Sequence, residues 1–428
     1  MRLQRNLLVL KHRNSLLLLI VLVAIFSGCQ NKDDNTVLIW TNKSDIVSYA
    51  EVFNSEQSKV KVVVSYKEKI SLPNAKDEKC PDIVIGSGIC NENTRKNFSS
   101  IGHLFHNPKM KRSQFYESVL DCGKIGHTQY LIPISFNLPL VIFTKENENL
   151  VPNDYLISLD ELRDISAKYN KKNARGIYTS IGFAPRWNDD FMYTVAKMQN
   201  VDFKFSDKKE ERFVWNQSAL DGTVSYLKNW TLSNNTSSSA EEDYAFKYLY
   251  MPEYKQVSLN RCLFESMTSD EFFSLPDDKI HSLEYRWLCY EDKIPLEDDM
   301  VFLGLYRKSE NTTNAEKFIV WLLSEETQQK VVERNQSMKL NTLNFGVLGG
   351  FSSLQSVNEK VLTKYTPSLR KNLPLPDYLE SINLYPEQWQ SIKESVIYPY
   401  LLDSTNTSVG LDEIPISQRM KHWKKQYF

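Results

Sequence analysis

Residues 130–145 read Tyr-Leu-Ile-Pro-Ile-Ser-Phe-Asn-Leu-Pro-Leu-Val-Ile-Phe-Thr-Lys, and no other stretch says more about the fold. Two apolar segments of strand length, 130–134 and 140–144, are separated by a polar junction that a proline interrupts. Such a junction between two strand patterns is typical of a crossover between lobes. We therefore predict that the chain passes here from one lobe of the molecule to a second one.

The chain before this crossover alternates strand and helix patterns. Residues 37–40 form a short apolar run, and Ser44 and Asp45 begin a segment with apolar residues at helical spacing. Residues 60–66 and 82–85 follow as strands. Strand, helix and strand in this order predict a parallel sheet covered by helices, in which ligands bind at the carboxyl ends of the strands.

A second set of α/β elements begins after the crossover. Ser158 and Glu161 form a capping-box pattern ahead of an amphipathic helix, and residues 300–306 form another strand pattern followed by a helix. Residues 233–242 are rich in serine, asparagine and threonine and predict a surface loop. A hydrophobic content of 41% over roughly 400 mature residues is enough for two cores.

The N-terminus has the pattern of a secretory signal. Four basic residues and no acid precede the apolar run 16–26, which is too short for the roughly 20 residues of a membrane span. The following Phe-Ser-Gly-Cys resembles the bacterial lipobox, which implies that 1–28 are a signal peptide and that Cys29 carries acyl chains such as palmitate. Residues 29–36 would then tether an exported protein to a cell membrane, facing the periplasm or the exterior. A plain signal peptide or a short signal anchor is the alternative.

Composition and motifs argue against several functions. Removal of the predicted signal leaves 48 basic and 53 acidic residues, a net charge near −5 that disfavours nucleic acid as a partner. No zinc-type cysteine spacing exists, and pairing of Cys80 with Cys90 stays open beside free thiols. His103 and His106 lack further ligands, so we expect no metal.

No pattern of catalysis is present either. The adjacent acids Asp189 and Asp190 are typical of a solvated surface, and residues 350–354 lack the second glycine of a nucleophile elbow. A phosphate loop and a dinucleotide fingerprint are absent from the sequence. We therefore expect neither a cofactor nor an enzyme.

Four segments of the chain together resemble the extracellular solute-binding proteins of ABC importers, in the sugar-binding class called family 1: 37–53, 81–86, 130–145 and 315–328. The resemblance implies an α/β, bilobed, periplasmic-binding-protein-like fold, with a ligand cleft between lobes that close by a hinge motion. It implies a first crossover at 135–138. It also implies the division into lobe 1, residues 37–135 and 300–340, and lobe 2, residues 136–299 and 341–428.

The function that this resemblance implies is capture of a small solute, with a carbohydrate expected, and its delivery to ABC permease subunits by a monomeric lipoprotein. A surface lipoprotein of the same fold that acts in adhesion or sensing is an alternative. A glycan-active enzyme is a further one. The identity of the ligand, the membrane that holds the anchor and the retention of transport stay open.

The predicted ligand-binding residues lie at strand ends and near the crossovers. Trp40 and Asn42 stand at the end of the first strand, and Ser87 and Gly88 end another, where backbone amides can approach a ligand. An indole can stack on a sugar ring and an amide can bond to its hydroxyls. Trp40 as an anchor of the core is an equal alternative.

The remaining predicted contacts belong to the crossover and to lobe 2. Asn137 occupies the crossover itself, Arg186 and Trp187 lie between a strand and a helix, and Trp389 falls where relatives place a stacking aromatic. Arg186 could bond to sugar hydroxyls or to a ligand carboxylate. The helical spacing around Trp389 fits core packing equally, and 267–270 is a weaker candidate segment.

Overall fold

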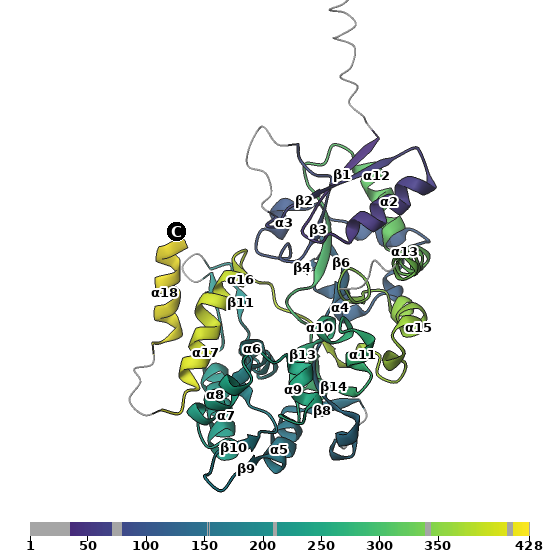
Figure 1. Ribbon diagram of the computed structural model, residues 1–428. Helices are drawn as coiled ribbons and strands as arrows, with labels where there is room; N and C mark the ends of the chain where they lie inside the picture. Colours follow the sequence, from purple (N-terminus) through teal and green to yellow (C-terminus); the bar gives the residue numbers. More distant parts are fainter. Residues whose placement is uncertain are drawn as a thin grey trace, which may run out of the picture.

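The computed structural model describes residues 35–70, 79–151, 153, 155–208, 212–338, 344–408 and 414–427. The predicted signal peptide and the lipid anchor at Cys29 lie outside the described residues. Figure 1 shows two α/β lobes, with β1 and β2 at one end of the molecule and the β9–β10 hairpin at the other. Within the described ranges, no helix has both the length and the apolar character that crossing a bilayer requires.

Lobe 1 is built on a six-stranded mixed sheet. Its strands, in spatial order, are β17 (Phe351–Ser352), β6 (Leu131–Phe136), β16 (Val301–Leu305), β3 (Ile83–Gly86), β1 (Thr36–Thr41) and β2 (Lys61–Tyr66). The predicted parallel start is confirmed, because β1 pairs in parallel with both β2 and β3. Strand β16 returns antiparallel between β3 and β6. Among the helices of this lobe are α2 (Ile46–Glu56), α3 (Thr94–Asn97), α4 (Glu117–Asp121), α12 (Thr312–Leu322) and α13 (Glu325–Ser337).

Lobe 2 has a four-stranded sheet of its own. The strand order is β13 (Glu265–Thr268), β7 (Pro139–Thr144), β14 (Leu283–Cys289) and β8 (Leu156–Ser158). Its main helices are α5 (Leu159–Tyr169), α6 (Asp189–Met198), α7 (Gln217–Asn234), α8 (Ser238–Lys247), α9 (Glu253–Ser258) and α10 (Ser269–Phe273). Near the C-terminus, α16 (Trp389–Ile392), α17 (Tyr398–Ser404) and α18 (Ile416–Tyr427) follow, and α17 packs on α6.

Local capping explains where two of these helices begin. The predicted capping box is confirmed, since the Glu161 amide donates to Ser158 Oγ at 3.3 Å and the Ser158 amide donates to Glu161 Oε2 at 2.9 Å. The predicted surface loop 233–242 is wrong at both ends, because α7 continues to Asn234 and α8 covers 238–247. Ser237 accepts a hydrogen bond from the Ala240 amide at 3.2 Å and starts α8.

The crossover predicted from residues 130–145 is confirmed. Strand β6 ends at Phe136 in the lobe 1 sheet, and β7 begins at Pro139 in the lobe 2 sheet. Every residue of both strands is buried, which accounts for their continuous apolar sequence. Two further connections run beside this one, because β15 (Ile294–Pro295) pairs with β18 (Leu379–Glu380). The stretch 296–300, between β15 and β16, is called the second crossover.

The boundary predicted at residue 341 differs from the structure. Phe351 and Ser352 of β17 pair with β6 and therefore belong to the lobe 1 sheet. The next short helix, α14 (Gln355–Val357), packs against α13 of the same lobe. A two-residue strand has no hydrophobic period, so the pattern could not reveal this return to lobe 1.

Polar contacts of Asn137 hold the first crossover in place. Its side-chain amide donates to Asp299 Oδ2 at 3.0 Å and to the Gly349 carbonyl at 2.9 Å, and its Oδ1 accepts from Ser269 Oγ at 2.7 Å. Its backbone carbonyl accepts from the Glu297 amide at 3.0 Å. The side chain is buried, so one asparagine connects the first crossover to the second crossover, to α10 and to the approach to β17.

We expect Asn137→Ala to lower the free energy of unfolding by about 1–3 kcal/mol, because it leaves buried polar partners without a hydrogen bond. Urea denaturation measures the change. Asn107→Ala is the matched control, since the exposed Asn107 side chain makes only a turn contact to the Lys109 amide. Equal stability of the two variants would contradict the structural role of Asn137.

Candidate functional site

The carboxyl ends of β1 and β3 lie at the edge of lobe 1 that faces the crossovers. Strand β16 leaves the second crossover at Val301, and its next residue, Phe302, pairs with Gly86 at the end of β3. Because β1 runs parallel to β3, its last residues reach the same edge. Lobe 2 presents the matching edge, since Thr268 at the end of β13 pairs with Pro139 just after the first crossover. The strand ends of the two lobes thus flank the same connections.

Asn42 and Ser87 form one polar group at the lobe 1 edge. The Asn42 side chain accepts from the Ser87 amide at 3.2 Å and donates to the Ser87 carbonyl at 3.3 Å. Glycine at position 86 makes room for this pair, because an added Cβ would lie 2.3 Å from Asn42 Oδ1 and would displace the Asn42 side chain. Gly88 is exposed with φ +78°, a conformation that favours glycine. The structure therefore brings together three of the predicted residues, Asn42, Ser87 and Gly88.

A small polar pocket of about 40 Å³, called pocket A here, lies at the lobe 2 edge. Its lining comes from the start of α6, from α10, from β7, β13 and β14, and from the second crossover. The residues are Pro139, Asn188, Asp190, Phe191, Thr194, Ser266, Met267, Thr268, Glu271, Leu288 and Glu297. Carboxylates and hydroxyls dominate its polar lining. It is thus a site for groups that donate hydrogen bonds.

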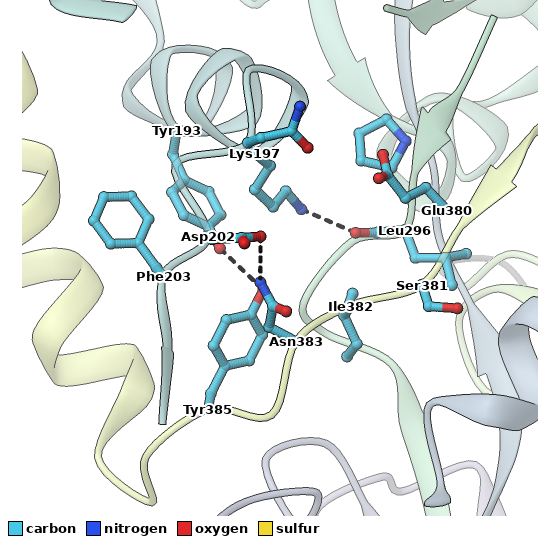
Figure 2. A pocket seen from close by; sticks show the side chains of 12 residues that line it. Tyr193, Lys197, Asp202, Phe203, Leu296, Glu380, Ser381, Ile382, Asn383 and Tyr385 are labelled. Atoms are coloured by element: carbon cyan, nitrogen blue, oxygen red, sulfur yellow. Dashed lines mark hydrogen bonds between the residues drawn. The ribbon is translucent and has the colours of Figure 1, made fainter. Parts of the chain in front are cut away.

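A larger pocket of about 130 Å³, called pocket B, lies toward the other end of α6. Its walls are α6, the turn after it, β15 and the segment that follows β18 (Figure 2). Asn383 Nδ2 donates to Asp202 Oδ1 at 3.4 Å across it, and Lys197 Nζ donates to the Leu296 carbonyl at 2.9 Å. Two of the three connections between the lobes therefore border this pocket.

The carboxylate of Asp298 lies beside α6, which contributes residues to both pockets, and organises this region. It accepts hydrogen bonds from Tyr193 at 2.7 Å, Tyr385 at 3.1 Å and the Trp389 indole at 2.9 Å. Two ammonium groups complete the cluster, Lys197 at 3.3 Å and Lys393 at 3.9 Å. Its side chain is only 4% exposed, so these partners replace the water that the carboxylate loses.

The pKa values of two neighbouring carboxyl groups, Asp298 and Glu297, shift in opposite directions. Burial alone would raise the pKa of Asp298, but Lys197, Lys393 and the donated hydrogen bonds hold this pKa below its usual value. The Glu297 side chain is 14% exposed, and its Oε2 lies 3.6 Å from Lys197 Nζ. Burial raises the pKa of Glu297 to about 7, although Lys197 and Lys393 act in the opposite direction. Pocket A therefore contains one carboxyl group that changes charge near neutral pH.

Arg186 faces the interior of lobe 2. Its guanidinium donates to the Leu402 carbonyl at 2.6 Å, to Thr405 Oγ1 at 2.7 Å and to Glu242 Oε1 at 2.8 Å, and its side chain is 2% exposed. Burial raises the pKa of the neighbouring Glu241 to about 7. The arginine joins η4 (Pro185–Trp187) to α8 and to the end of α17.

The three predicted tryptophans also have internal partners. Trp40 is 2% exposed and lies under Lys67, with 4.6 Å from Nζ to the ring centroid. Trp187 stacks on Tyr244 and donates to the Glu241 carbonyl at 3.2 Å. Trp389 stacks on Tyr385, with centroids 4.2 Å apart and planes 4° apart. One face of this indole and its N–H are therefore already occupied within the protein.

Neither pocket includes any of the eight predicted ligand-binding residues in its lining. Contact between a ligand and Trp40, Asn42, Ser87, Gly88, Asn137, Arg186, Trp187 or Trp389 stays a prediction. Met267 and Thr268 of the weaker candidate segment do line pocket A. Sequence reasoning missed Glu297 and Asp298 because two adjacent acids at a crossover are indistinguishable from acids on a solvated surface.

Among the described residues, no three histidine, cysteine or acidic side chains are grouped to hold a metal ion. Cys80 and Cys90 are both free thiols in the structure. Cys90 instead contacts the Cys122 carbonyl oxygen at 3.2 Å.

Comparison with solved structures defines the class of fold. The chain is similar to the sugar-binding protein MalE from Xanthomonas citri, with TM-score 0.62 and 12% identity over 91% of this chain and 96% of that one. It is similar to a cyclo/maltodextrin-binding protein complexed with maltotetraose, with TM-score 0.60 and 14% identity over 93% and 98%. An ABC substrate-binding protein from Listeria monocytogenes in complex with cycloalternan has TM-score 0.57 and 11% identity over 91% and 97%.

These likenesses establish the bilobed fold of sugar-binding ABC solute-binding proteins, which the sequence predicted. No protein-family model matches the sequence, and no curated protein sequence matches it.

We expect Arg186→Ala to lower the free energy of unfolding by about 3–5 kcal/mol, because it leaves the buried carboxyl group of Glu241, whose Oε2 lies 3.9 Å from Arg186 Nε, without its cationic partner. Urea denaturation of this variant beside Arg175→Ala, a change at an exposed arginine, measures the difference. A stable Arg186→Ala protein that loses ligand binding would instead make Arg186 a ligand contact.

The raised pKa of Glu297 predicts a pH-dependent stability. Between its ordinary pKa of 4.5 and about 7, the folded protein keeps a proton that the unfolded chain has lost, so the contribution of Glu297 to stability falls as pH rises through this window. Above pH 7 the contribution is constant. Since glutamine does not titrate, Glu297→Gln should gain about 2 kcal/mol relative to the wild type between pH 5 and pH 8.

Unfolding free energies at several pH values test this prediction, with Glu394→Gln as the control at an exposed glutamate. The difference between wild type and Glu297→Gln should grow with pH, and that for Glu394→Gln should stay flat. Parallel profiles for all three proteins would show that Glu297 titrates at its ordinary pKa.

Proposed function

We propose that this chain is the substrate-binding protein of an ABC importer and captures a carbohydrate between its two lobes. The observation that carries the proposal is the placement of polar strand ends from both lobes at the edges that flank the crossovers. Asn42 and Ser87 supply amide and hydroxyl groups from lobe 1, and pocket A supplies carboxylates and hydroxyls from lobe 2. Sugar hydroxyls donate and accept hydrogen bonds and can satisfy both sets.

The structural neighbours support the carbohydrate class. Several are described with a bound sugar or oligosaccharide, among them maltotetraose and cycloalternan. Their likeness extends over both lobes and includes the crossovers. A carbohydrate is therefore the first class of ligand to test, and a binding protein rather than an enzyme is the role that these neighbours favour.

The mechanism follows from contacts on both sides of the hinge. A ligand bonded to lobe 1 and to pocket A binds better when the edges are close, so it shifts the population toward the closed form. Glu297 would contribute from the crossover itself, next to the Asp298 cluster. Asn93 Nδ2 donates to Glu387 Oε2 at 2.9 Å between the lobes, a contact that opening would break.

Export and membrane attachment complete the proposed role. The N-terminal signal pattern and the lipobox-like cysteine support a lipoprotein held at a membrane, where permease subunits could receive the ligand from the closed form. Neighbouring genes for two permease subunits would support this part of the proposal.

A sugar and oligosaccharide screen by intrinsic tryptophan fluorescence tests the capture function. We expect one or more saccharides to give a saturable shift without product formation. Glu297→Gln should weaken that binding about tenfold at pH 8, because a charged acceptor forms stronger hydrogen bonds than a neutral one.

Glu380→Gln is the matched control, since Glu380 lines pocket B. Its affinity should equal that of the wild type. An absence of any response to the panel would contradict carbohydrate capture, and turnover of a saccharide would make the protein an enzyme. Equal loss of affinity in both variants would remove pocket A from the binding site.

A further inference from the structure

The three most exposed large hydrophobic side chains of the described residues lie within five consecutive positions. Tyr250 is 96% exposed, Phe246 is 76% exposed and Leu249 is 61% exposed. They occupy the end of α8 and the turn before α9. We call this the aromatic turn. Large hydrophobic side chains gathered on an exposed turn indicate a surface that binds another molecule or a membrane.

Tyrosines beneath the aromatic turn fix its position. Tyr244 of α8 is buried and donates its hydroxyl to the carbonyls of Arg261 and, at 3.3 Å, Thr179. It also stacks on Trp187 and meets Tyr248 edge to face. The exposed side chains therefore stand on a rigid base, beside the β9 (Lys171–Lys172) and β10 (Tyr178–Ser180) hairpin (Figure 1).

Basic side chains surround the aromatic turn. Six of them are exposed on the hairpin, at the end of α8, and on α9 and the segment after it: Lys171, Lys172, Arg175, Lys247, Lys255 and Arg261. Within the described part of the chain, none of these six forms an ion pair with a carboxylate. On α8 and α9, the exposed acidic residues that form no ion pair within the described part of the chain are Asp243 and Glu253. This end of lobe 2 is therefore positively charged, whereas the whole chain carries a net charge of −1.

Several of these cations lie over tyrosine rings. Lys172 Nζ is 4.4 Å from the Tyr178 centroid, Lys247 Nζ is 5.4 Å from the Tyr244 centroid, and the Arg261 guanidinium is 5.8 Å from the Tyr248 centroid. The Lys247 ammonium also donates to the Tyr178 carbonyl at 3.3 Å, which joins α8 to the hairpin. The cations are thereby held around the turn and still lack anionic partners.

We propose that the aromatic turn and its basic surround form a binding surface for an anionic phospholipid bilayer. The side chains of phenylalanine and leucine cannot form hydrogen bonds to a soluble polyanion. They can insert into a bilayer at the boundary between headgroups and acyl chains. Tyrosine fits the same boundary because one end of its side chain is apolar and the other polar. The surrounding lysines and arginines complement the negative headgroups.

Such a contact would orient the molecule. The surface lies at the end of lobe 2 farthest from β1 (Figure 1). Attachment near the start of β1 and contact through the aromatic turn would hold both ends at one bilayer and lay both lobes along it. The proposal itself requires neither the predicted lipid at Cys29 nor carbohydrate capture.

Vesicle co-sedimentation tests the surface on the whole folded chain from residue 30 onward, which lacks the predicted signal and acylated cysteine. We expect binding to vesicles of phosphatidylglycerol and phosphatidylethanolamine, weakening as salt is added, and no binding to phosphatidylcholine alone. The double variant Phe246→Ser, Tyr250→Ser should bind at least tenfold more weakly. Matched control changes at exposed residues of lobe 1 are Tyr66→Ser and Met338→Ser, which should leave binding unchanged.

Charge is tested separately. Replacing Lys171, Lys172 and Arg175 by glutamine should weaken binding about a hundredfold, and replacing the exposed Lys59, Lys61 and Lys96 of lobe 1 by glutamine should have no such effect. Lack of binding to anionic vesicles would overturn the proposal. Equal loss of vesicle binding in the test and control variants would also overturn it. So would a soluble anionic glycan that binds more tightly than the vesicles do and whose binding the serine double variant leaves unchanged.

Discussion

A buried carboxylate, Asp298, anchors the second crossover to lobe 2. Asp298 could not be buried as an anion alone, because removing a charge from water costs several kcal/mol. Lys197 from α6 and Lys393 from the C-terminal region supply positive charge, while Tyr193, Tyr385 and the Trp389 indole donate hydrogen bonds. One side chain thereby fixes the positions of α6, the crossover and the last part of lobe 2. Asn137 holds the first crossover in place through the hydrogen bonds of its uncharged side-chain amide.

This constraint also determines which groups remain for a ligand. The aromatic side chains near the crossover pack on one another or on the cluster, as Trp389 does on Tyr385. The groups left at the facing edges are polar, such as those of Ser87, Thr268 and Glu297. A ligand recognised here would be held mainly by hydrogen bonds, which suits a polyhydroxylated molecule.

Much of the fold was readable from the sequence because its central strands are buried on both faces. Strands β6 and β7 appear as two apolar runs with a polar break, and that break is the crossover. The capping box at Ser158 is equally local. Pairing of β17 with β6 was not readable, because a strand of two residues has no period and its partner lies far away in the chain. The start of α8 was hidden because serines favour loops and helix caps alike.

The candidate site was predictable only in part, for a related reason. Asn42, Ser87 and Gly88 follow strands, and the rule that ligands gather at strand ends located them. Arg186 and Trp389 have the residue types of a binding site, but their long side chains can reach several partners, and the partners they contact come from distant segments. Glu297 and Asp298 are neighbours in sequence with opposite pKa shifts, a difference that depends on the placement of two lysines.

Small-angle X-ray scattering of the purified protein, with and without a saccharide found by titration, tests the central claim most directly. If the ligand is held between the strand ends of both lobes, saturation should decrease the radius of gyration and change the profile in the way that closure of two lobes predicts. Superimposable profiles at full saturation would contradict the account, since a ligand that contacts one lobe only has no means of drawing the two together.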